Sequence, residues 1–230
     1  MKPLYIITAR GGSKGIPHKN IKLLGGRPLI AYTIDAAIEA ARTSGGYILL
    51  STDDSEIADV ARSCGLAVDY MRPASLGGDN IGSREVILDA MDWATDRGID
   101  YDCVVLLQPT SPLRTAADIT EAEALYSPDI DMVVSLCPSD VNPYFNMFEV
   151  DGKGFITISK GDGMYTRRQD CPTVYEQNGA VYVINPASIR TMPLGAFPRR
   201  VPFIMPRSRS IDLDTPADWA VAETIMNNGK

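Results

Sequence analysis

Short apolar runs alternate with helix-like apolar patterns along the first 136 residues, and this alternation restricts the fold more than any other feature of the chain. The runs are apolar at consecutive positions, as in strands buried on both faces, and predict strands at 3–8, 47–51, 67–71, 103–107 and 132–136. Between them the pattern predicts helices that begin near Leu29 and at 55–64, 83–94 and 118–125. We therefore expect an α/β fold with a doubly wound, mostly parallel sheet built from right-handed βαβ units.

Residues 138–171 break this alternation, because prolines and glycines punctuate them. Two short runs, 145–150 and 154–159, predict antiparallel strands that are joined at Asp151-Gly152. We interpret this region as a small, hairpin-rich excursion from the core.

The apolar pattern then returns to the core. Residues 180–184 predict another buried strand, and 215–226 a closing helix with Thr215 as its N-cap and Pro216 at its first position. No internal repeat is present, so we expect residues 1–230 to form a single domain.

The charge balance excludes two classes of partner. The chain has 22 basic and 29 acidic residues, a net charge of -7 and a pI near 4.8. Such a chain lacks the basic surface of a protein that binds nucleic acid or anionic lipid nonspecifically. In addition, no stretch approaches the roughly 20 apolar residues of a membrane span. We expect neither nucleic acid nor a membrane as a partner, and a local basic cluster must hold any anionic substrate.

Histidine and cysteine usage narrows the chemistry. His18 is the single histidine, so a multi-histidine zinc site is excluded and a Ser-His-Asp triad would depend on one loop residue. The four cysteines are widely spaced without a CxxC motif, which is typical of free thiols in a reducing compartment, and we expect a cytoplasmic protein. Carboxylates, lysines and arginines must then carry any chemistry.

A glycine-rich, basic stretch, ARGGSKGIPHKN at 9–20, follows the first predicted strand. Glycines let backbone N–H groups approach an anion closely, while Arg10, Lys14 and Lys19 supply positive charge that the whole chain lacks. The stretch is neither a Walker loop nor a GxGxxG fingerprint, and a solvated turn is the alternative interpretation. Its place at a carboxyl edge of a parallel sheet favours a loop that binds polyphosphate.

Six blocks follow one another along nearly the whole chain: ARGGSKGIPHKNIKLLGGRPLI, STDD, RPASLGGDN, LLQPTSPLR, NGAVY and SIDLDTPADW. In content and order they resemble the acylneuraminate cytidylyltransferases, or CMP-sialic acid synthetases. The resemblance implies a nucleotide-diphospho-sugar transferase-like fold. It also implies an enzyme that transfers CMP from CTP to the anomeric hydroxyl of a nine-carbon acidic sugar, such as an N-acylneuraminate or legionaminate, and releases pyrophosphate. Two alternatives stay open: a nucleotidyltransferase of the same fold for another sugar or nucleotide, and a non-catalytic nucleotide-binding protein.

By this resemblance the nucleotide-binding residues are Arg10, Gly12, Ser13, Lys19, Asn20, Arg72 and Ser83. Arg10, Lys19 and Asp214 are the expected catalytic residues, because phosphoryl-transfer sites neutralise charge with Lys, Arg and magnesium. Arg72 and Ser83 stand where the family reads cytosine and ribose, with an exposed arginine and a helix-capping serine as the alternatives. Lys14 is interpreted as a solvated loop charge.

The resemblance places the acidic sugar near Gln108, Arg168, Asn178 and Tyr182. Gln108 ends a buried strand at the edge where α/β sheets bind ligands. Arg168 offers a guanidinium that suits a sugar carboxylate, and a surface charge pair is its alternative. Glu176 and Phe145 stand where some bacterial sialic acid members have arginine and lysine, so legionaminic, pseudaminic or another nonulosonic acid also fits.

Asp212 and Asp214 alternate in the segment SIDLDT, which places both carboxylates on one face if the segment is extended. Two such carboxylates can share a hard cation with substrate phosphates, and the resemblance implies Mg²⁺ as the cofactor. The alternative is that Asp214 belongs to the cap of the last helix. Asp53 and Asp54 form a second acidic pair, which capping of the helix at 55–64 explains.

The resemblance finally implies a homodimer, because the family's equivalent of residues 138–171 projects into a partner subunit and completes its sugar pocket. The candidate contact residues are aromatic: Tyr144, Phe145, Phe148 and Phe155. A core within the hairpin itself is the alternative role for these side chains.

Overall fold

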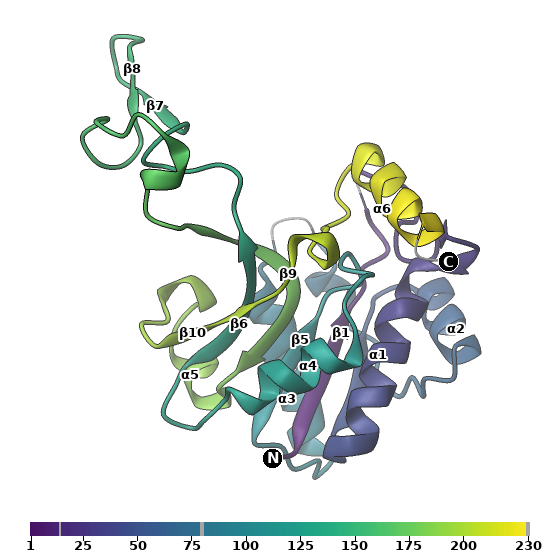
Figure 1. The fold of residues 1–230 in the computed structure, drawn as a ribbon. Coiled ribbons are helices and arrows are strands. Elements are labelled where there is room, and N and C mark those ends of the chain that lie inside the picture. Colours follow the sequence, from purple (N-terminus) through teal and green to yellow (C-terminus); the bar gives the residue numbers. More distant parts are fainter. Residues whose placement is uncertain (14, 79–80, 229–230) are drawn as a thin grey trace.

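The computed structural model describes residues 1–228 apart from 14, 79 and 80. Its core is a six-stranded sheet in the order β10-β6-β9-β5-β1-β4, with helices on both faces (Figure 1). The strands are β1 (Pro3–Thr8), β2 (Leu23–Leu24), β3 (Arg27–Pro28), β4 (Tyr47–Ser51), β5 (Cys103–Leu107), β6 (Met132–Pro138), β7 (Phe148–Val150), β8 (Ile156–Ile158), β9 (Tyr175–Ile184) and β10 (Arg200–Ile204). The α-helices are α1 (Leu29–Ser44), α2 (Ser55–Ser63), α3 (Ser83–Asp96), α4 (Ala116–Ala124), α5 (Pro186–Thr191) and α6 (Pro216–Asn228).

Two apolar clusters hold the helices to the sheet. On one face, α1, α2 and α4 pack through residues such as Ile34, Ile57 and Ile119. On the other face, α3 and α5 pack through residues such as Ile87 and Ile189. Alternate residues of β1 belong to one cluster or the other, so the central strand is buried on both faces, as its continuous apolar run predicted.

The strand directions confirm the mostly parallel sheet. β1 pairs in parallel with β4 and β5, and β10 pairs in parallel with β6. β9 runs antiparallel between β5 and β6. The apolar pattern does not predict β10, because Pro202 interrupts the run. The strand lies at an edge of the sheet, where proline is tolerated.

The strand expected at 67–71 is wrong, because this segment has no regular secondary structure and joins no sheet. Tyr70 is buried against α3, so the apolar pattern of this segment reflects the burial of its side chains and not a strand. The segment meets the sheet where β4 has just ended, with the backbone N–H of Arg72 donating to the carbonyl of Thr52 at 2.8 Å. Burial of alternate side chains does not require a ladder of backbone hydrogen bonds, and here the ladder is not formed.

The hairpin expected in the excursion is confirmed. β7 and β8 pair antiparallel and stand well away from the central sheet (Figure 1). In the turn between them, Asp151 Oδ1 accepts hydrogen bonds from the backbone N–H groups of Lys153 and Phe155 at 2.8 and 2.9 Å. Gly154 has a φ of 86°, a left-handed conformation that glycine adopts readily.

The start of α6 is also as predicted. Thr215 and Asp218 form a capping box, in which each side chain accepts a hydrogen bond from the other residue's backbone N–H, at 3.3 and 2.7 Å. Pro216 occupies the first position of the helix. Asp214 therefore leaves its carboxylate outside the cap. None of the helices in the described residues has the length and apolar character that crossing a membrane requires.

Candidate active site

A cleft of about 380 Å³ opens where β1 and β5 end. The two strands run in parallel, so the loops after them lie at the edge of the sheet where α/β folds bind ligands. Eight of the expected site residues line this cleft: Arg10, Ser13, Lys19, Asn20, Arg72, Ser83, Gln108 and Asp214. The lining does not include Gly12, Arg168, Asn178, Tyr182 or Asp212.

The glycine-rich loop forms a basic part of the cleft wall. Asn20, which is buried, donates from Nδ2 to the backbone carbonyl of Arg10 at 2.9 Å and thereby links the two ends of the loop. Arg10, at one end, and Ser13, between the two ends, line the cleft. Gly12 is exposed outside the lining, and Lys14 lies outside the described residues.

Lys19 joins this loop to the segment before α6. Its Nζ donates to the carbonyl of Leu213 at 2.6 Å and lies 3.2 Å from Asp214 Oδ1. Gly15 packs against the same segment, since a Cβ at this position would collide with the carbonyl oxygen of Asp214. The contacts hold the ammonium group of Lys19 at the cleft beside a carboxylate that is 74% exposed.

Arg72 enters the cleft from the segment after Tyr70. Its side chain is only 4% exposed, and its Nη2 donates to Asp53 Oδ1 at 3.1 Å. The same carboxylate oxygen accepts the backbone N–H of Gly11 at 3.1 Å. Burial tends to raise the pKa of Asp53, but the hydrogen bonds from Gly11 and Arg72 outweigh burial and leave the pKa below its ordinary value.

Capping therefore explains only one member of the acidic pair at the end of β4. Asp54 is the N-cap of α2, and its Oδ1 accepts the backbone N–H groups of Glu56 and Ile57 at 2.8 and 3.3 Å. The capping interpretation is wrong for Asp53, which contacts the glycine loop and Arg72 instead. Asp53 thus binds the backbone of Gly11 and the side chain of Arg72, while Asp54 caps α2 and also packs against Gly11, where a Cβ would collide with Asp54 Oδ2.

Ser83 is the first residue of α3, and Gly82 is the N-cap without a side-chain cap bond. The capping alternative for Ser83 is therefore wrong. Ser83 is exposed and lines the cleft at the beginning of the helix, where backbone N–H groups have no partner within the helix. An anionic or carbonyl-bearing ligand group suits this position.

Gln108 follows β5 and lies close to Gly179 of β9. A Cβ on Gly179 would lie 2.8 Å from Gln108 Oε1 and 3.3 Å from Asp212 Oδ2, and the residue has a φ of 69°. The β6–β9 pairing shifts register beside this glycine, between Val134 and Leu136. A glycine bulge thus makes room for Gln108 and Asp212 together. Gly179 is not among the residues predicted to form the site, although a glycine next to an apolar strand pattern is a signal for a close approach.

The side chain of Asn178 is occupied within the protein. It is 2% exposed; its Oδ1 accepts from Ser135 Oγ at 2.6 Å and its Nδ2 donates to Ser210 Oγ at 2.9 Å. Ser111 Oγ donates to the backbone carbonyl of Asn178 at 3.1 Å, so this hydroxyl also holds the bulge. Tyr182 follows Asn178 further along β9. Burial and the negative charge of Asp212 raise the pKa of Tyr182.

Asp212 and Asp214 flank Leu213, which is fully buried. Burial raises the pKa of Asp212; the Asp214 carboxylate raises it further, while Thr110 and Lys19 act in the opposite direction. Within the described residues, Asp212 Oδ1 is buried without a hydrogen-bond partner. Two neighbouring carboxylates, one with an unsatisfied oxygen, fit the oxygen ligands that Mg²⁺ prefers.

This pair does not form a complete protein cage. Across the described part of the chain, no group of three or more His, Cys, Asp or Glu side chains is placed to hold a metal ion. Magnesium sites usually combine one or two carboxylates with substrate phosphates and water, so the arrangement of Asp212 and Asp214 suits a cation that arrives with a nucleotide.

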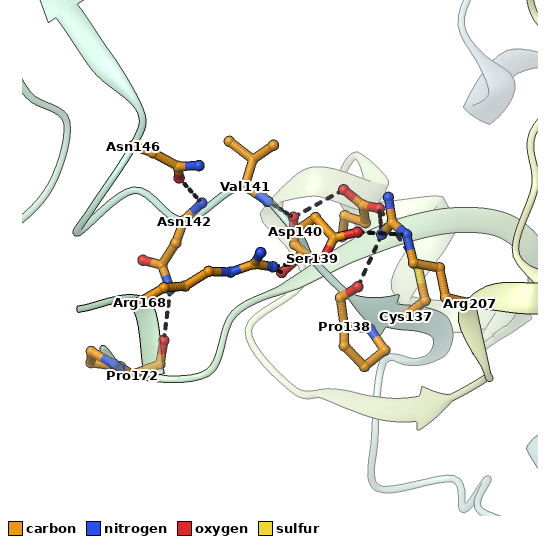
Figure 2. A network of polar contacts seen from close by, with 11 residues as sticks. Cys137, Pro138, Ser139, Asp140, Val141, Asn142, Asn146, Arg168, Pro172 and Arg207 are labelled. Carbon is orange, nitrogen blue, oxygen red and sulfur yellow. Dashed lines mark hydrogen bonds and ion pairs between the residues drawn. The ribbon is translucent and has the colours of Figure 1, made fainter. Parts of the chain in front are cut away.

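Arg168 lies at the base of the excursion, in the polar network of Figure 2. Its Nη2 donates to Asp140 Oδ1 at 2.6 Å, and Asp140 also pairs with Arg207 Nε at 3.0 Å. Arg207 in turn donates to Glu176 Oε1 at 2.7 Å. Within a single chain, Arg168 is therefore engaged in a charge network and is not brought to the cleft.

The family model described as "Cytidylyltransferase" matches residues 4–200, which include every residue of the cleft lining except Asp214. The chain belongs to the cytidylyltransferase family. The resemblance found in the sequence is thereby confirmed, and the site just described is that of a cytidylyltransferase-family protein.

Two relatives are similar to the chain in sequence, and one solved structure is similar to it in fold. It is 33% identical to the CMP-N,N'-diacetyllegionaminic acid synthase of Legionella pneumophila, over 98% of this chain and 97% of that protein. It is 36% identical to the N-acylneuraminate cytidylyltransferase of Streptococcus agalactiae over 95% of this chain, but spans only 52% of that protein's length. The fold is similar to a CMP:2-keto-3-deoxy-manno-octonic acid synthetase solved with CTP, with a TM-score of 0.74 at 16% identity over 100% of both chains.

Proposed function

We propose that this protein is a Mg²⁺-dependent nucleotidyltransferase that transfers CMP from CTP to the anomeric hydroxyl of a nine-carbon acidic sugar. The observation that carries the proposal is the gathering of Arg10, Lys19 and Arg72 in one cleft of an otherwise acidic chain. Such a concentration of positive charge at the ligand edge of an α/β sheet suits a nucleoside triphosphate. Membership of the cytidylyltransferase family, and relatives named for legionaminic and acylneuraminic acids, support the base and the sugar class.

At the α-phosphorus of CTP, one bond forms and one breaks. The anomeric oxygen of the sugar attacks this phosphorus, the bond from the phosphorus to the bridging oxygen breaks, pyrophosphate leaves, and the hydroxyl proton passes to solvent. Arg10 and Lys19 offset negative charge on the transferring and leaving oxygens. Asp212 and Asp214 hold Mg²⁺, which further neutralises the phosphates when it is bound.

The remaining cleft residues position the two substrates. Arg72 and Ser83 face the nucleoside, and Gln108 faces the sugar at the end of β5. Positioning contributes strongly to such a reaction, because two anions must be held with the attacking oxygen in line with the leaving group.

We also propose that the protein is a homodimer formed through the excursion. Val150, Phe155, Ile156 and Met164 are 70, 68, 63 and 76% exposed in this region. An isolated two-stranded hairpin cannot bury such residues, and exposed apolar groups close together mark protein contacts. In the dimer, Arg168 of the partner subunit would supply the guanidinium that the sugar carboxylate needs.

We place the protein in the cytoplasm. Its four cysteines are all free thiols, and two of them, Cys103 and Cys137, are buried. Unpaired cysteines persist in reducing compartments.

The proposed function is tested by pyrophosphate release from CTP and Mg²⁺ with N-acetylneuraminate, legionaminate, pseudaminate and 3-deoxy-manno-octulosonate supplied separately. We expect release with one of the three nine-carbon sugars. Release only with the eight-carbon sugar, or only with another nucleotide, would instead indicate a different transferase of this fold. CTP binding without release from any sugar would favour a non-catalytic nucleotide-binding protein.

A further inference from the structure

Asp53 occupies the junction of three segments that approach the cleft. Its Oδ1 accepts hydrogen bonds from Gly11 in the glycine loop and from Arg72, each at 3.1 Å. Its Oδ2 lies so close to Gly77 that a Cβ on this glycine would collide with it. Asp53 itself does not line the cleft, so it acts on the segments that do.

The strand before Asp53 reinforces this junction from the backbone. Ala9 donates to the carbonyl of Ser51 at 3.0 Å, and Arg72 donates to the carbonyl of Thr52 at 2.8 Å. The end of β4 therefore contacts both segments through consecutive backbone carbonyls and then through the Asp53 carboxylate. One short stretch thus sets the spacing between the glycine loop and Arg72.

On the basis of the proposed function, we propose that Asp53 is a positioning residue that holds the phosphate-binding glycine loop and the base-facing Arg72 at the spacing a cytidine triphosphate requires. The carboxylate neutralises the guanidinium of a side chain that is only 4% exposed. Arg72 Nε has no hydrogen-bond partner within the described residues, and the Asp53 carboxylate is the counterion of this cation. Loss of the charge leaves a buried guanidinium without its counterion, a situation that side chains relieve by moving.

The test compares Asp53→Asn with Asp54→Asn. Both variants remove one negative charge at adjacent positions, but asparagine keeps the N-cap of α2, so Asp54→Asn controls for net charge and for the stability of this corner. For Asp53→Asn we expect the Kd for CTP, measured by calorimetry, and the KM for CTP to rise about tenfold or more, as for the loss of a charged hydrogen bond. We expect the KM for the sugar to stay within about twofold of wild type, because Asp53 does not contact the sugar side.

Gly77→Ala provides a second route to the same effect without any change of charge. Gly77 has a φ of -87°, which alanine adopts without backbone strain. We therefore expect the new Cβ to displace the Asp53 carboxylate by direct collision. Hydrogen exchange of the backbone amide of Gly11 in the nucleotide-free protein should accelerate in both variants and not in Asp54→Asn.

The outcomes separate the inference from the proposed function. If folded Asp53→Asn and Gly77→Ala proteins bind CTP within twofold of wild type and leave the exchange of Gly11 unchanged, Asp53 has no positioning role. If KM for CTP and KM for the sugar rise equally, the effect is a general loss of structure and the inference is again overturned. If the wild-type protein itself does not bind CTP, the proposed function and the inference fail together.

Discussion

Lys19 and Asp214, 195 residues apart in the sequence, form an ion pair of 3.2 Å at the edge of the cleft. The carbonyl of Leu213 holds the same ammonium group at 2.6 Å. In the proposed reaction, Lys19 contacts the phosphates of CTP and Asp214 contacts the divalent cation. The ion pair therefore joins the residue that binds the negative phosphates to the residue that binds the positive metal ion. This contact makes the first loop and the segment before α6 one site.

Removal of the Asp214 carboxylate should separate binding from turnover. For Asp214→Asn we expect at least a hundredfold loss of kcat in the presence of Mg²⁺, with CTP binding retained, because charge stabilisation in the transition state is lost while the basic wall stays intact. Single-turnover kinetics and calorimetry measure the two effects. Asp129→Asn, an exposed carboxylate elsewhere on the surface, is the control. Normal turnover of both Asp212→Asn and Asp214→Asn would disprove the metal assignment.

Loss of Arg114 should destabilise the fold. This arginine is 4% exposed and donates to the carbonyls of Gln108 and Ala180 at 3.1 and 2.8 Å and to Thr33 Oγ1 at 2.6 Å. Burial lowers its pKa to about 10. Arg114→Met leaves buried carbonyls unpaired, and we expect a loss of about 3 kcal/mol in the free energy of unfolding, measured with urea.

The control for Arg114 is Arg62→Met, which removes an exposed ion pair with Asp59 at 2.7 Å. Exposed pairs contribute little, so the change should stay below about 0.5 kcal/mol. Equal effects of the two substitutions would show that the hydrogen bonds from Arg114 to the carbonyls of Gln108 and Ala180 do not stabilise the fold.

Acid should weaken the fold partly through Asp131. Arg199 and Ser188 hydrogen bond to this carboxylate and hold its pKa at about 2, against an ordinary value of 3.8. A folded-state pKa below the unfolded value means that the stabilisation is present above pH 3.8 and is lost as the pH falls towards 2. The difference in unfolding free energy between wild type and Asp131→Asn should therefore shrink across this interval. A difference independent of pH would contradict the assignment.

Dimer formation should depend on the apolar tip of the excursion. For the double variant Phe155→Ser and Met164→Ser we expect a monomer in sedimentation velocity at micromolar concentration, with CTP binding retained and turnover with the sugar lost. Val221→Ser on α6 removes a residue that is 51% exposed and should leave the assembly unchanged. Sedimentation of the wild-type protein as a monomer would contradict the proposed dimer.

Local patterns predicted most of the elements. Continuous apolar runs marked β1, β4, β5 and β6, because a strand buried on both faces needs apolar residues at every position. Thr215 and Pro216 marked the start of α6, because capping involves groups only three residues apart. The strand predicted at 67–71 was wrong, because Tyr70 in this segment is buried although the backbone forms no ladder of hydrogen bonds with a neighbouring strand.

Eight of the cleft residues could be named from the sequence, because the family resemblance points to them and because the glycine loop and Gln108 directly follow strands whose ends share an edge of the sheet. The partners of the individual side chains could not be predicted from the sequence. Asp53 and Asp54 are chemically identical neighbours, and only their orientation assigns one to Arg72 and the other to α2.

The sequence by itself determined the elements, the ligand-binding edge and the family, since these depend on periodicity, on the ends of strands and on blocks of adjacent residues. Only the tertiary structure decided that Lys19 meets Asp214, that Gly179 makes room for Gln108, and that Arg168 is held outside the cleft of its own chain. These contacts join segments that are far apart in the chain. Their geometry follows from the order of the strands in the sheet and from bulges within it, which local sequence patterns do not encode.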